Sequence, residues 1–209
     1  MALEHPLLLV DMDGPLAGLD DSFFEKCSLN GWNLDIDCVA SQTRRFISEH
    51  VSDPDHHRQS LELLDAPWFF RELPVVPGAR EGIDALLSAD LEIWLCTKPL
   101  ETSNTSRDEK AAWVHEHFPE FDGKILMVPD KSLAKGDVLL DDAIPLNWLG
   151  RSYWTPMVFT MPYNGEGSVW EKLPHFSWSD PVDGLISFCR RQYALKHRPS
   201  ISRHKERLR

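Results

Sequence analysis

The 209-residue sequence lacks several features that would place it in a whole class of proteins. No apolar run approaches the roughly 18 to 20 residues of a membrane-spanning helix, and the opening MALEHPLLLV does not fit a signal peptide. The cysteines form no CxxC pair, so the sequence indicates neither a disulfide framework nor a zinc knuckle. We therefore expect a cytoplasmic protein with reduced thiols and no membrane association. Its cysteines are Cys27, Cys38, Cys96 and Cys189.

Several catalytic and binding motifs are also missing. The sequence contains no G-x-S-x-G, no P-loop and no complete G-x-G-x-x-G. Cys96 is not the nucleophile of a cysteine phosphatase, because Thr102 stands where the phosphate-binding Arg of C-x5-R belongs. A zinc site is disfavoured because the histidine pairs lack helical i,i+4 spacing and have no cysteine or third histidine nearby. These pairs are His56 with His57 and His115 with His117.

Positive charge is scarce outside one end of the chain. The net charge is -11, but the stretch Arg190–Arg209 carries +7, which leaves -18 for the remainder. An acidic body disfavours general nucleic-acid binding and requires local cations or a metal ion for an anionic ligand. Phosphate binding by the basic tail stays open as an alternative to a solvated, flexible terminus.

Five short apolar runs indicate buried strands, and amphipathic segments between several of them indicate helices. Strands without polar alternation, separated by helices, are typical of a parallel sheet covered on both faces. The fold class is therefore α/β with a Rossmann-like sheet. The expected strands are Leu7–Val10, Leu91–Cys96, Lys124–Val128, Val138–Leu140 and Met157–Thr160, and the expected helices are Gly78–Ser88, Arg107–Phe118 and Pro181–His197.

About 80 residues separate the first two strands, whereas a simple crossover needs only about a dozen. This interval contains three expected helices, Asp20–Cys27, Ser41–His50 and Ser60–Leu64, and no convincing strand. We expect a helical insertion that folds over the carboxyl end of the sheet. The resulting division is a core of residues 1–17 and 75–197, a helical cap of residues 18–74, and a basic, flexible tail of residues 198–209.

Chemically distinctive side chains follow four of the expected strands. Ligands of open α/β sheets bind at the edge where the strands end. Each motif alone has an ordinary explanation as a turn, a cap or a solvated charge, but their order and strand context together favour a site. The motifs are VDMDG with Asp11 and Asp13, LCTKP with Thr97, PDKS with Lys131, and LLDD with Asp141 and Asp142.

Four carboxylates at one edge repel each other unless a cation joins them, and Mg²⁺ is the hard, oxygen-binding ion that fits. Asp11 supplies a carboxylate nucleophile that forms an acyl-phosphate. Asp13, two residues beyond, is placed to protonate the leaving oxygen and later to activate water. Thr97 and Lys131 are placed to hold the phosphoryl oxygens. The pattern therefore predicts a magnesium-dependent phosphatase.

This pattern resembles the haloacid-dehalogenase superfamily, whose motifs are D-x-D, a Ser/Thr, a Lys and an acidic pair in that order. More narrowly, the chain is similar to the 5'(3')-deoxyribonucleotidases. The resemblance covers most of residues 7–145. The segments that carry it are LVDMDGPLA, the RRF-ISE segment around Phe46, WFFRELPVVPGA at 68–79, CTKP at 96–99, DEKAAWVHEHF at 108–118 and DKS...LLDD at 131–142.

The resemblance assigns further roles. It implies that Asp11, the backbone carbonyl of Asp13 and Asp142 bind the metal, whereas Asp141 contacts it only indirectly, through another ligand or a water molecule. It implies a nucleotide substrate under the cap and a homodimer as the oligomeric state. The phosphate-binding candidates are Thr97, Lys98, Lys131 and Lys110, and the substrate-pocket candidates are Phe46, Ile47 and Phe69.

Three positions depart from the family pattern. Pro15 replaces an aliphatic residue, Leu19 stands where an aromatic base-stacking residue is expected, and Lys98 replaces a small residue. The base and sugar preference therefore stays open. The expected activity is hydrolysis of deoxyribonucleoside monophosphates. The alternatives are a phosphatase for a sugar phosphate or another small phosphomonoester, and a nucleotide-binding protein without turnover.

Overall fold

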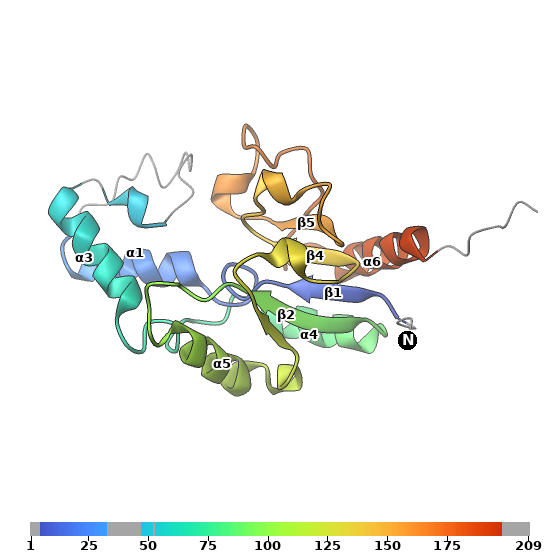
Figure 1. Ribbon diagram of the computed structural model, residues 1–209, viewed down its shortest axis with the longest axis horizontal. Coiled ribbons are helices and arrows are strands. Elements are labelled where there is room, and N and C mark those ends of the chain that lie inside the picture. The colour runs from blue at the N-terminus through green and yellow to red at the C-terminus, as the bar shows by residue number, and fades with distance from the viewer. Residues whose placement is uncertain (1–4, 33–46, 52, 198–209) are drawn as a thin grey trace, which may run out of the picture.

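The centre of the computed structural model, which describes residues 5–32, 47–51 and 53–197, is a six-stranded sheet (Figure 1). All neighbouring strands are parallel, in the order β3-β2-β1-β4-β5-β6. The α/β fold predicted from the sequence is therefore confirmed. The strands are β1 (Leu7–Val10), β2 (Glu92–Thr97), β3 (Ile125–Met127), β4 (Val138–Asp141), β5 (Thr155–Phe159) and β6 (His175–Phe176).

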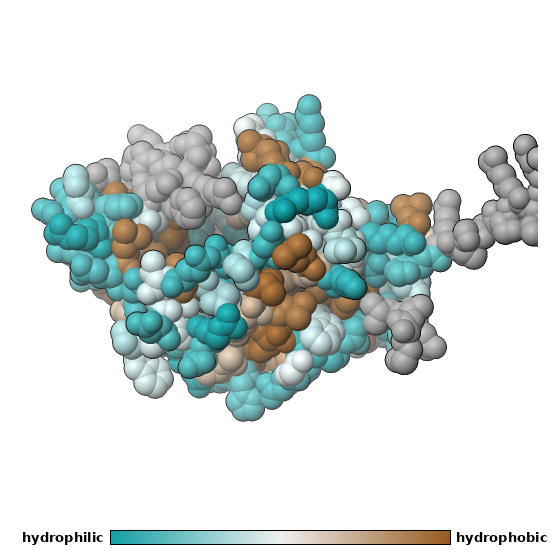
Figure 2. Space-filling view, in the orientation of Figure 1, coloured by the Kyte–Doolittle hydropathy of each residue, from teal (hydrophilic) through white to brown (hydrophobic). Residues whose placement is uncertain are grey.

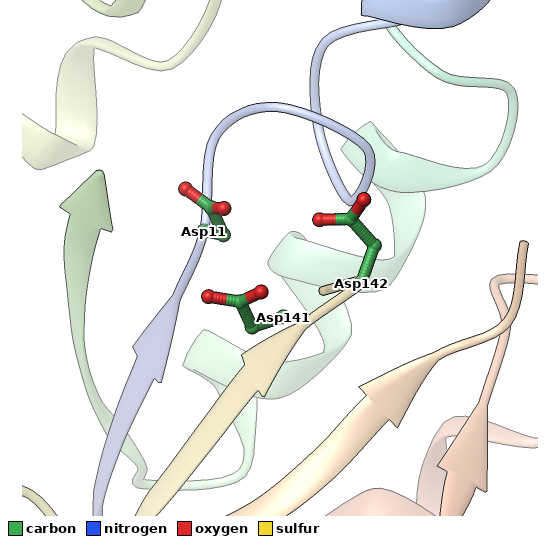
Figure 3. Close-up of side chains that lie close together, drawn as sticks. All are labelled: Asp11, Asp141 and Asp142. Atoms are coloured by element: carbon green, nitrogen blue, oxygen red, sulfur yellow. The ribbon is translucent and has the colours of Figure 1, made fainter. Parts of the chain in front are cut away.

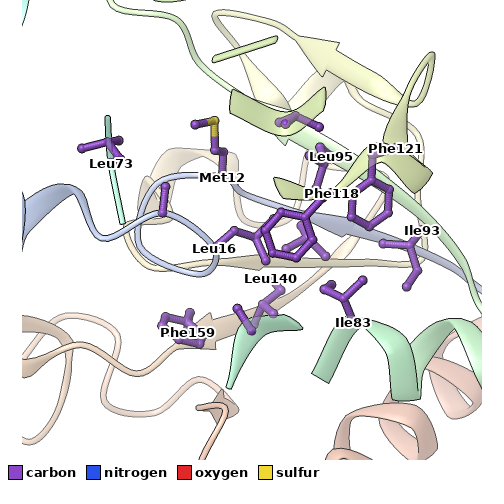
Figure 4. Close-up of a cluster of buried hydrophobic side chains, with 14 of the residues drawn as sticks. Met12, Leu16, Leu73, Ile83, Ile93, Leu95, Phe118, Phe121, Leu140 and Phe159 are labelled. Atoms are coloured by element: carbon purple, nitrogen blue, oxygen red, sulfur yellow. The ribbon is translucent and has the colours of Figure 1, made fainter. Parts of the chain in front are cut away.

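One face of the sheet packs against three helices, α4 (Ala79–Ser88), α5 (Ser106–His117) and α6 (Val182–Lys196). Right-handed crossovers place α4 and α5 on the same face, since β1, β2 and β3 follow each other towards one edge. This face carries the main core, in which every second side chain of β1 is fully buried against the helices. Figure 4 labels part of this core: Met12, Leu16, Leu73, Ile83, Ile93, Leu95, Phe118, Phe121, Leu140 and Phe159.

The other face of the sheet is covered by turns and loops rather than by these three helices. The connections after β3 and β4 contain only the 3-10 turns η3 (Lys131–Leu133) and η4 (Leu146–Trp148). A smaller cluster around Leu9 and Trp154 fills part of this face. Beside it lies an apolar groove of about 540 Å³ lined by residues such as Trp94 and Leu126, in the region where Figure 2 shows hydrophobic atoms at the surface.

The insertion between β1 and β2 contains helices α1 (Leu19–Leu29) and α3 (Pro54–Asp65) and the 3-10 turn η1 (Ile47–His50). Asp53 caps α3 by accepting the N–H groups of Asp55 and His56. Figure 1 shows α1 and α3 beyond the carboxyl ends of the strands. Most of the expected helix 41–50 and the basic tail lie outside the described residues.

The remaining 3-10 turns are η2 (Pro119–Phe121) and η5 (Pro162–Asn164). Within the described ranges, no helix combines the length and apolar character required to cross a membrane.

Candidate active site

Three aspartates meet where β1 and β4 end. Val10 pairs with Leu140 in the sheet, so the next residues, Asp11 and Asp141, are brought side by side, and Asp142 follows directly. One carboxylate oxygen of each aspartate lies within 4.8 Å of the others. Figure 3 shows the three side chains close together at the ends of β1 and β4. The parallel register of the two strands therefore assembles the cluster from segments about 130 residues apart.

Lys131 joins two of these carboxylates. Its Nζ lies 2.5 Å from Asp11 Oδ2 and 2.7 Å from Asp141 Oδ2. The indole of Trp154 donates to the backbone carbonyl of Lys131 at 2.8 Å and fixes the turn that carries it. Burial alone would lower the pKa of Lys131, but the two carboxylates overcome this effect and raise it. Lys131 is therefore a fixed cation at the base of the site.

The negative charges of the three aspartates are only partly balanced by Lys131. Burial raises the pKa of Asp11 to about 6, an effect opposed by Lys131 and reinforced by Asp141 and Asp13. Burial, followed by the charges of Asp141 and Asp11, raises the pKa of Asp142 well above its usual range. Lys131 pairs with Asp11 and Asp141 only, so the charge of Asp142 lacks an equally close cation among the described residues. An oxygen-ligated divalent cation such as Mg²⁺ fits this donor set.

Asp13 is held by a different lysine. The ammonium of Lys110, fully buried on α5, donates to Asp13 Oδ2, to Thr97 Oγ1 at 3.1 Å and to the carbonyl of Lys98 at 3.2 Å. The ring of Phe70 covers this ammonium, whose distance from the ring centre is 5.0 Å. The other carboxylate oxygen of Asp13, Oδ1, is buried and has no hydrogen-bond partner among the described residues. Lys110 thus links Asp13 to Thr97, which belongs to the second of the four motifs.

The remaining candidates lie further from this centre. Lys98 directs its half-exposed ammonium to Glu101 at 3.1 Å, and only its backbone carbonyl contacts the site through Lys110. Ile47 packs against the main core, and Phe69 is only 2% exposed within it. Phe46 lies outside the described residues. The phosphate-binding role of Lys98 and the pocket roles of Phe46, Ile47 and Phe69 stay predictions. The burial of Phe69 favours the alternative that its side chain packs in the core.

Two residues near the site, Asp20 and Trp178, were not predicted from the sequence. Asp20, in the first turn of α1, stands near the cluster, and burial together with the charges of Asp21 and Asp13 raises its pKa to about 6. No sequence signal distinguished it from an ordinary helix-start aspartate. Trp178 contacts the loop that carries Asp13, and its position 163 residues after Pro15 hid that contact. Cys96 is buried and its pKa is raised to about 12 by burial, which agrees with the rejection of a thiolate nucleophile.

Comparison with known proteins identifies this arrangement. Residues 5–191 match the model of the family described as 5' nucleotidase, deoxy (pyrimidine), cytosolic type C protein (NT5C). The chain belongs to this family. A Bordetella bronchiseptica protein provisionally named 5'(3')-deoxyribonucleotidase is 30% identical over 187 residues, which cover 86% of this chain and 97% of that protein. The cytosolic-type 5'(3')-deoxyribonucleotidase of Homo sapiens is 29% identical over 75% of this chain and 81% of its own length.

Solved structures agree on the fold. A HAD family hydrolase from Deinococcus radiodurans R1, solved with bound phosphate and sodium, has a TM-score of 0.53 at 15% identity and covers 90% of this chain and 96% of its own. A hydrolase from Pseudomonas syringae has a TM-score of 0.52 at 16% identity, with coverages of 88% and 98%. This member of the deoxynucleotidase family is therefore a hydrolase of phosphoric monoesters, and its fold is similar to that of HAD family hydrolases. The predicted family is confirmed.

Proposed function

We propose that the protein hydrolyses deoxyribonucleoside monophosphates to a nucleoside and phosphate through an aspartyl-phosphate on Asp11. One observation supports this mechanism above all. The carboxylates of Asp11 and Asp13 lie two residues apart in the chain but form ion pairs with different lysines. Lys131 holds Asp11 within the metal-binding cluster, and Lys110 holds Asp13 beside Thr97. Two carboxylates in separate environments can act as nucleophile and as acid and base in one reaction.

The reaction takes place in two displacements. A carboxylate oxygen of Asp11 bonds to phosphorus as the ester P–O bond breaks, and the departing oxygen takes a proton from Asp13. Water then attacks phosphorus and gives a proton to Asp13, while the bond from Asp11 to phosphorus breaks. Thr97 and Lys131 hold the non-bridging oxygens during both displacements. Lys110 occupies Oδ2 of Asp13, whereas the buried Oδ1 has no hydrogen-bond partner among the described residues, so we assign the proton transfers to Oδ1.

Asp11, the backbone carbonyl of Asp13 and Asp142 would hold Mg²⁺, with Asp141 as an indirect partner. When bound, the ion neutralises the carboxylates and the charge that develops on the phosphoryl group. The cluster supports this assignment, since its three carboxylates lie within 4.8 Å of one another and such like charges repel unless a cation joins them.

The substrate preference follows from the family and from the cap. The relatives that the chain matches are named as deoxyribonucleotidases, and the cap helices stand over the site. An apolar wall against the sugar 2' carbon would reject a hydroxyl group at a cost of about 1–3 kcal/mol, so we propose a modest preference for deoxyribonucleotides. The predicted homodimer and cytoplasmic location belong to the same proposal, and the relatives include both cytosolic and mitochondrial enzymes.

A phosphate-release screen tests this function. Deoxyribonucleoside and ribonucleoside monophosphates, sugar phosphates and p-nitrophenyl phosphate are compared with Mg²⁺ and with excess chelator. Asp11→Asn and Asp13→Asn are then examined by mass spectrometry for phosphate on the Asp11 peptide. We expect no phosphoenzyme in Asp11→Asn and a slowly hydrolysed one in Asp13→Asn. A preference for sugar phosphates over every nucleotide would contradict the substrate, full activity in chelator would contradict the metal, and label on another residue would contradict the nucleophile.

A further inference from the structure

The loop that carries Asp13 is held from the opposite end of the chain. The indole N–H of Trp178, just beyond β6, donates to the backbone carbonyl of Pro15 at 2.6 Å. Pro15 lies two residues after Asp13 in the turn that leads from β1 to α1. Figure 1 places this turn at the carboxyl end of the sheet. A side chain outside all the recognised motifs is thus bonded to the catalytic loop.

The side chain of Trp178 is tightly packed between α4 and the sheet. A Cβ atom on Gly82 would lie 2.2 Å from Cε3 of the indole ring, and one on Gly78 would lie 2.9 Å from the Cβ of Trp178. The rings of Phe159 and Phe176 pack against it, with centroid distances of 6.0 and 5.2 Å. Gly82 is inside α4, where glycine is a poor helix former, but any larger residue would collide with the ring. The indole is therefore fixed by its surroundings.

The loop transmits this fixed position to Asp13. The carbonyl of Met12 accepts hydrogen bonds from the N–H groups of Leu16 and Ala17 at 3.0 and 2.8 Å, and Gly14 N–H donates to the carbonyl of Ala17 at 2.9 Å. These bonds close a tight turn around Pro15, whose ring restricts its own backbone. A displacement of the Pro15 carbonyl therefore moves the backbone on which Asp13 is mounted.

We propose that Trp178 is a positioning residue that holds Asp13 in line with the leaving oxygen, an inference that rests on the acid role proposed for Asp13. Lys110 fixes Oδ2 of the carboxylate, and the indole of Trp178 fixes the backbone from the other side of the loop. Both constraints are needed because proton transfer requires hydrogen-bond geometry at the reacting atom.

Two substrates that differ in the basicity of the leaving group can distinguish a positioning role of Trp178 from a purely structural one. Phenyl phosphate and p-nitrophenyl phosphate have similar shapes, but the phenolate leaving group is more basic and depends more on protonation by Asp13. The ratio kcat/KM reports the steps up to departure of the phenol, before the aspartyl-phosphate is hydrolysed. A misplaced Asp13 therefore lowers kcat/KM for phenyl phosphate more than for p-nitrophenyl phosphate.

Two replacements remove the indole N–H. Trp178→Phe keeps an aromatic ring, and incorporation of benzothienylalanine at position 178 keeps the ring size while sulfur replaces N–H. We expect kcat/KM for phenyl phosphate to fall about tenfold and for p-nitrophenyl phosphate less than about twofold. Trp94→Phe, which removes an indole bond to Glu92 on the other face of the sheet, is the matched control and should change neither value.

A second pair of variants leaves Trp178 itself unchanged. One of them should displace the indole ring, and the other is its control. Gly82→Ala introduces the colliding Cβ, whereas Gly184→Ala makes the same change in α6, where nothing lies within 4 Å of the new atom. Gly82→Ala should show the same loss for phenyl phosphate, and Gly184→Ala should match the wild type. Thermal unfolding of each variant identifies any general loss of structure.

Asp13→Asn sets the reference for these measurements. If it loses activity selectively on phenyl phosphate and Trp178→Phe shows the same pattern, without a further loss when the two are combined, the proposal stands. Equal losses on both substrates in Trp178→Phe and the benzothienylalanine variant would overturn the role of Trp178 alone. Equal losses in Asp13→Asn would overturn the proposed acid itself, and so are distinguishable from a failure of Trp178.

Discussion

Lys110 and Asp13 form an ion pair that joins the middle of a core helix to the loop after the central strand. The lysine side chain is only 1% exposed and also donates to Thr97 and to the carbonyl of Lys98. A charge buried this deeply requires its partners, because an unpaired ammonium in the core is strongly destabilising.

Lys110→Met should therefore impair catalysis more than phosphate binding. Without the ammonium, Asp13 loses the group that orients it, and we expect kcat for a deoxynucleotide to fall about 100-fold with a smaller change in KM. Lys124→Met is the control, since Lys124 forms a partly exposed ion pair with Glu92 at the other edge of the sheet. A rise in KM with unchanged kcat would instead assign Lys110 to phosphate binding.

Asp142→Asn should increase stability while it removes metal binding. The raised pKa of Asp142 means that its negative charge destabilises the folded state when no cation is bound. In excess chelator we expect the variant to unfold at a higher temperature than the wild type. Added Mg²⁺ should raise the Tm of the wild type but not of the variant. Asp90→Asn, at an exposed position far from the site, is the control, and an equal Mg²⁺ response in Asp142→Asn would contradict the assignment.

Asp20 should make the stability of the metal-free protein depend on pH. Because its pKa is about 6 when folded and about 4 when unfolded, the folded state binds the proton more tightly, and stability falls as the pH rises between these values. Asp20→Asn should therefore stabilise the protein by about 1–3 kcal/mol above pH 6, with no gain below about pH 4. Urea unfolding across this range measures the effect. Glu25→Gln, an exposed change on the same helix, should show no such pH dependence.

Phe69 and Phe46 should respond differently to truncation. Phe69 is buried and packs edge to face on Phe70, with a centroid distance of 5.2 Å, so Phe69→Ala should cost about 3–5 kcal/mol of stability. Its effect on p-nitrophenyl phosphate and nucleotide hydrolysis should be similar. Phe46→Ala should lower kcat/KM for nucleotides and spare p-nitrophenyl phosphate, as expected of a pocket residue. A nucleotide-selective loss in Phe69→Ala would instead place Phe69 in the pocket.

Periodicity and strand-end motifs predicted five of the six strands and the three core helices, because those elements bury continuous apolar faces. β6 escaped because two residues, His175–Phe176, are too few to form a pattern. The 3-10 turns that follow β3 and β4 were not predicted, because such short turns have no helical periodicity. The hydrogen-bond partners of Lys110 could not be predicted from the sequence of α5. Asp13 follows β1 and Thr97 ends β2, and they meet Lys110 only because these strands are neighbours in the folded sheet.

The position of β1 at the centre of the sheet determines the order in which the chain can fold. β1 pairs with β2 about 85 residues later and with β4 about 130 residues later, so neither neighbour exists when β1 leaves the ribosome. Contacts between such distant segments are slow to form. The local helices α1 and α3 can form during this delay, whereas the nucleophile and its lysine meet only after synthesis has passed β4. The catalytic centre therefore cannot assemble until the chain has been synthesised at least as far as Asp142.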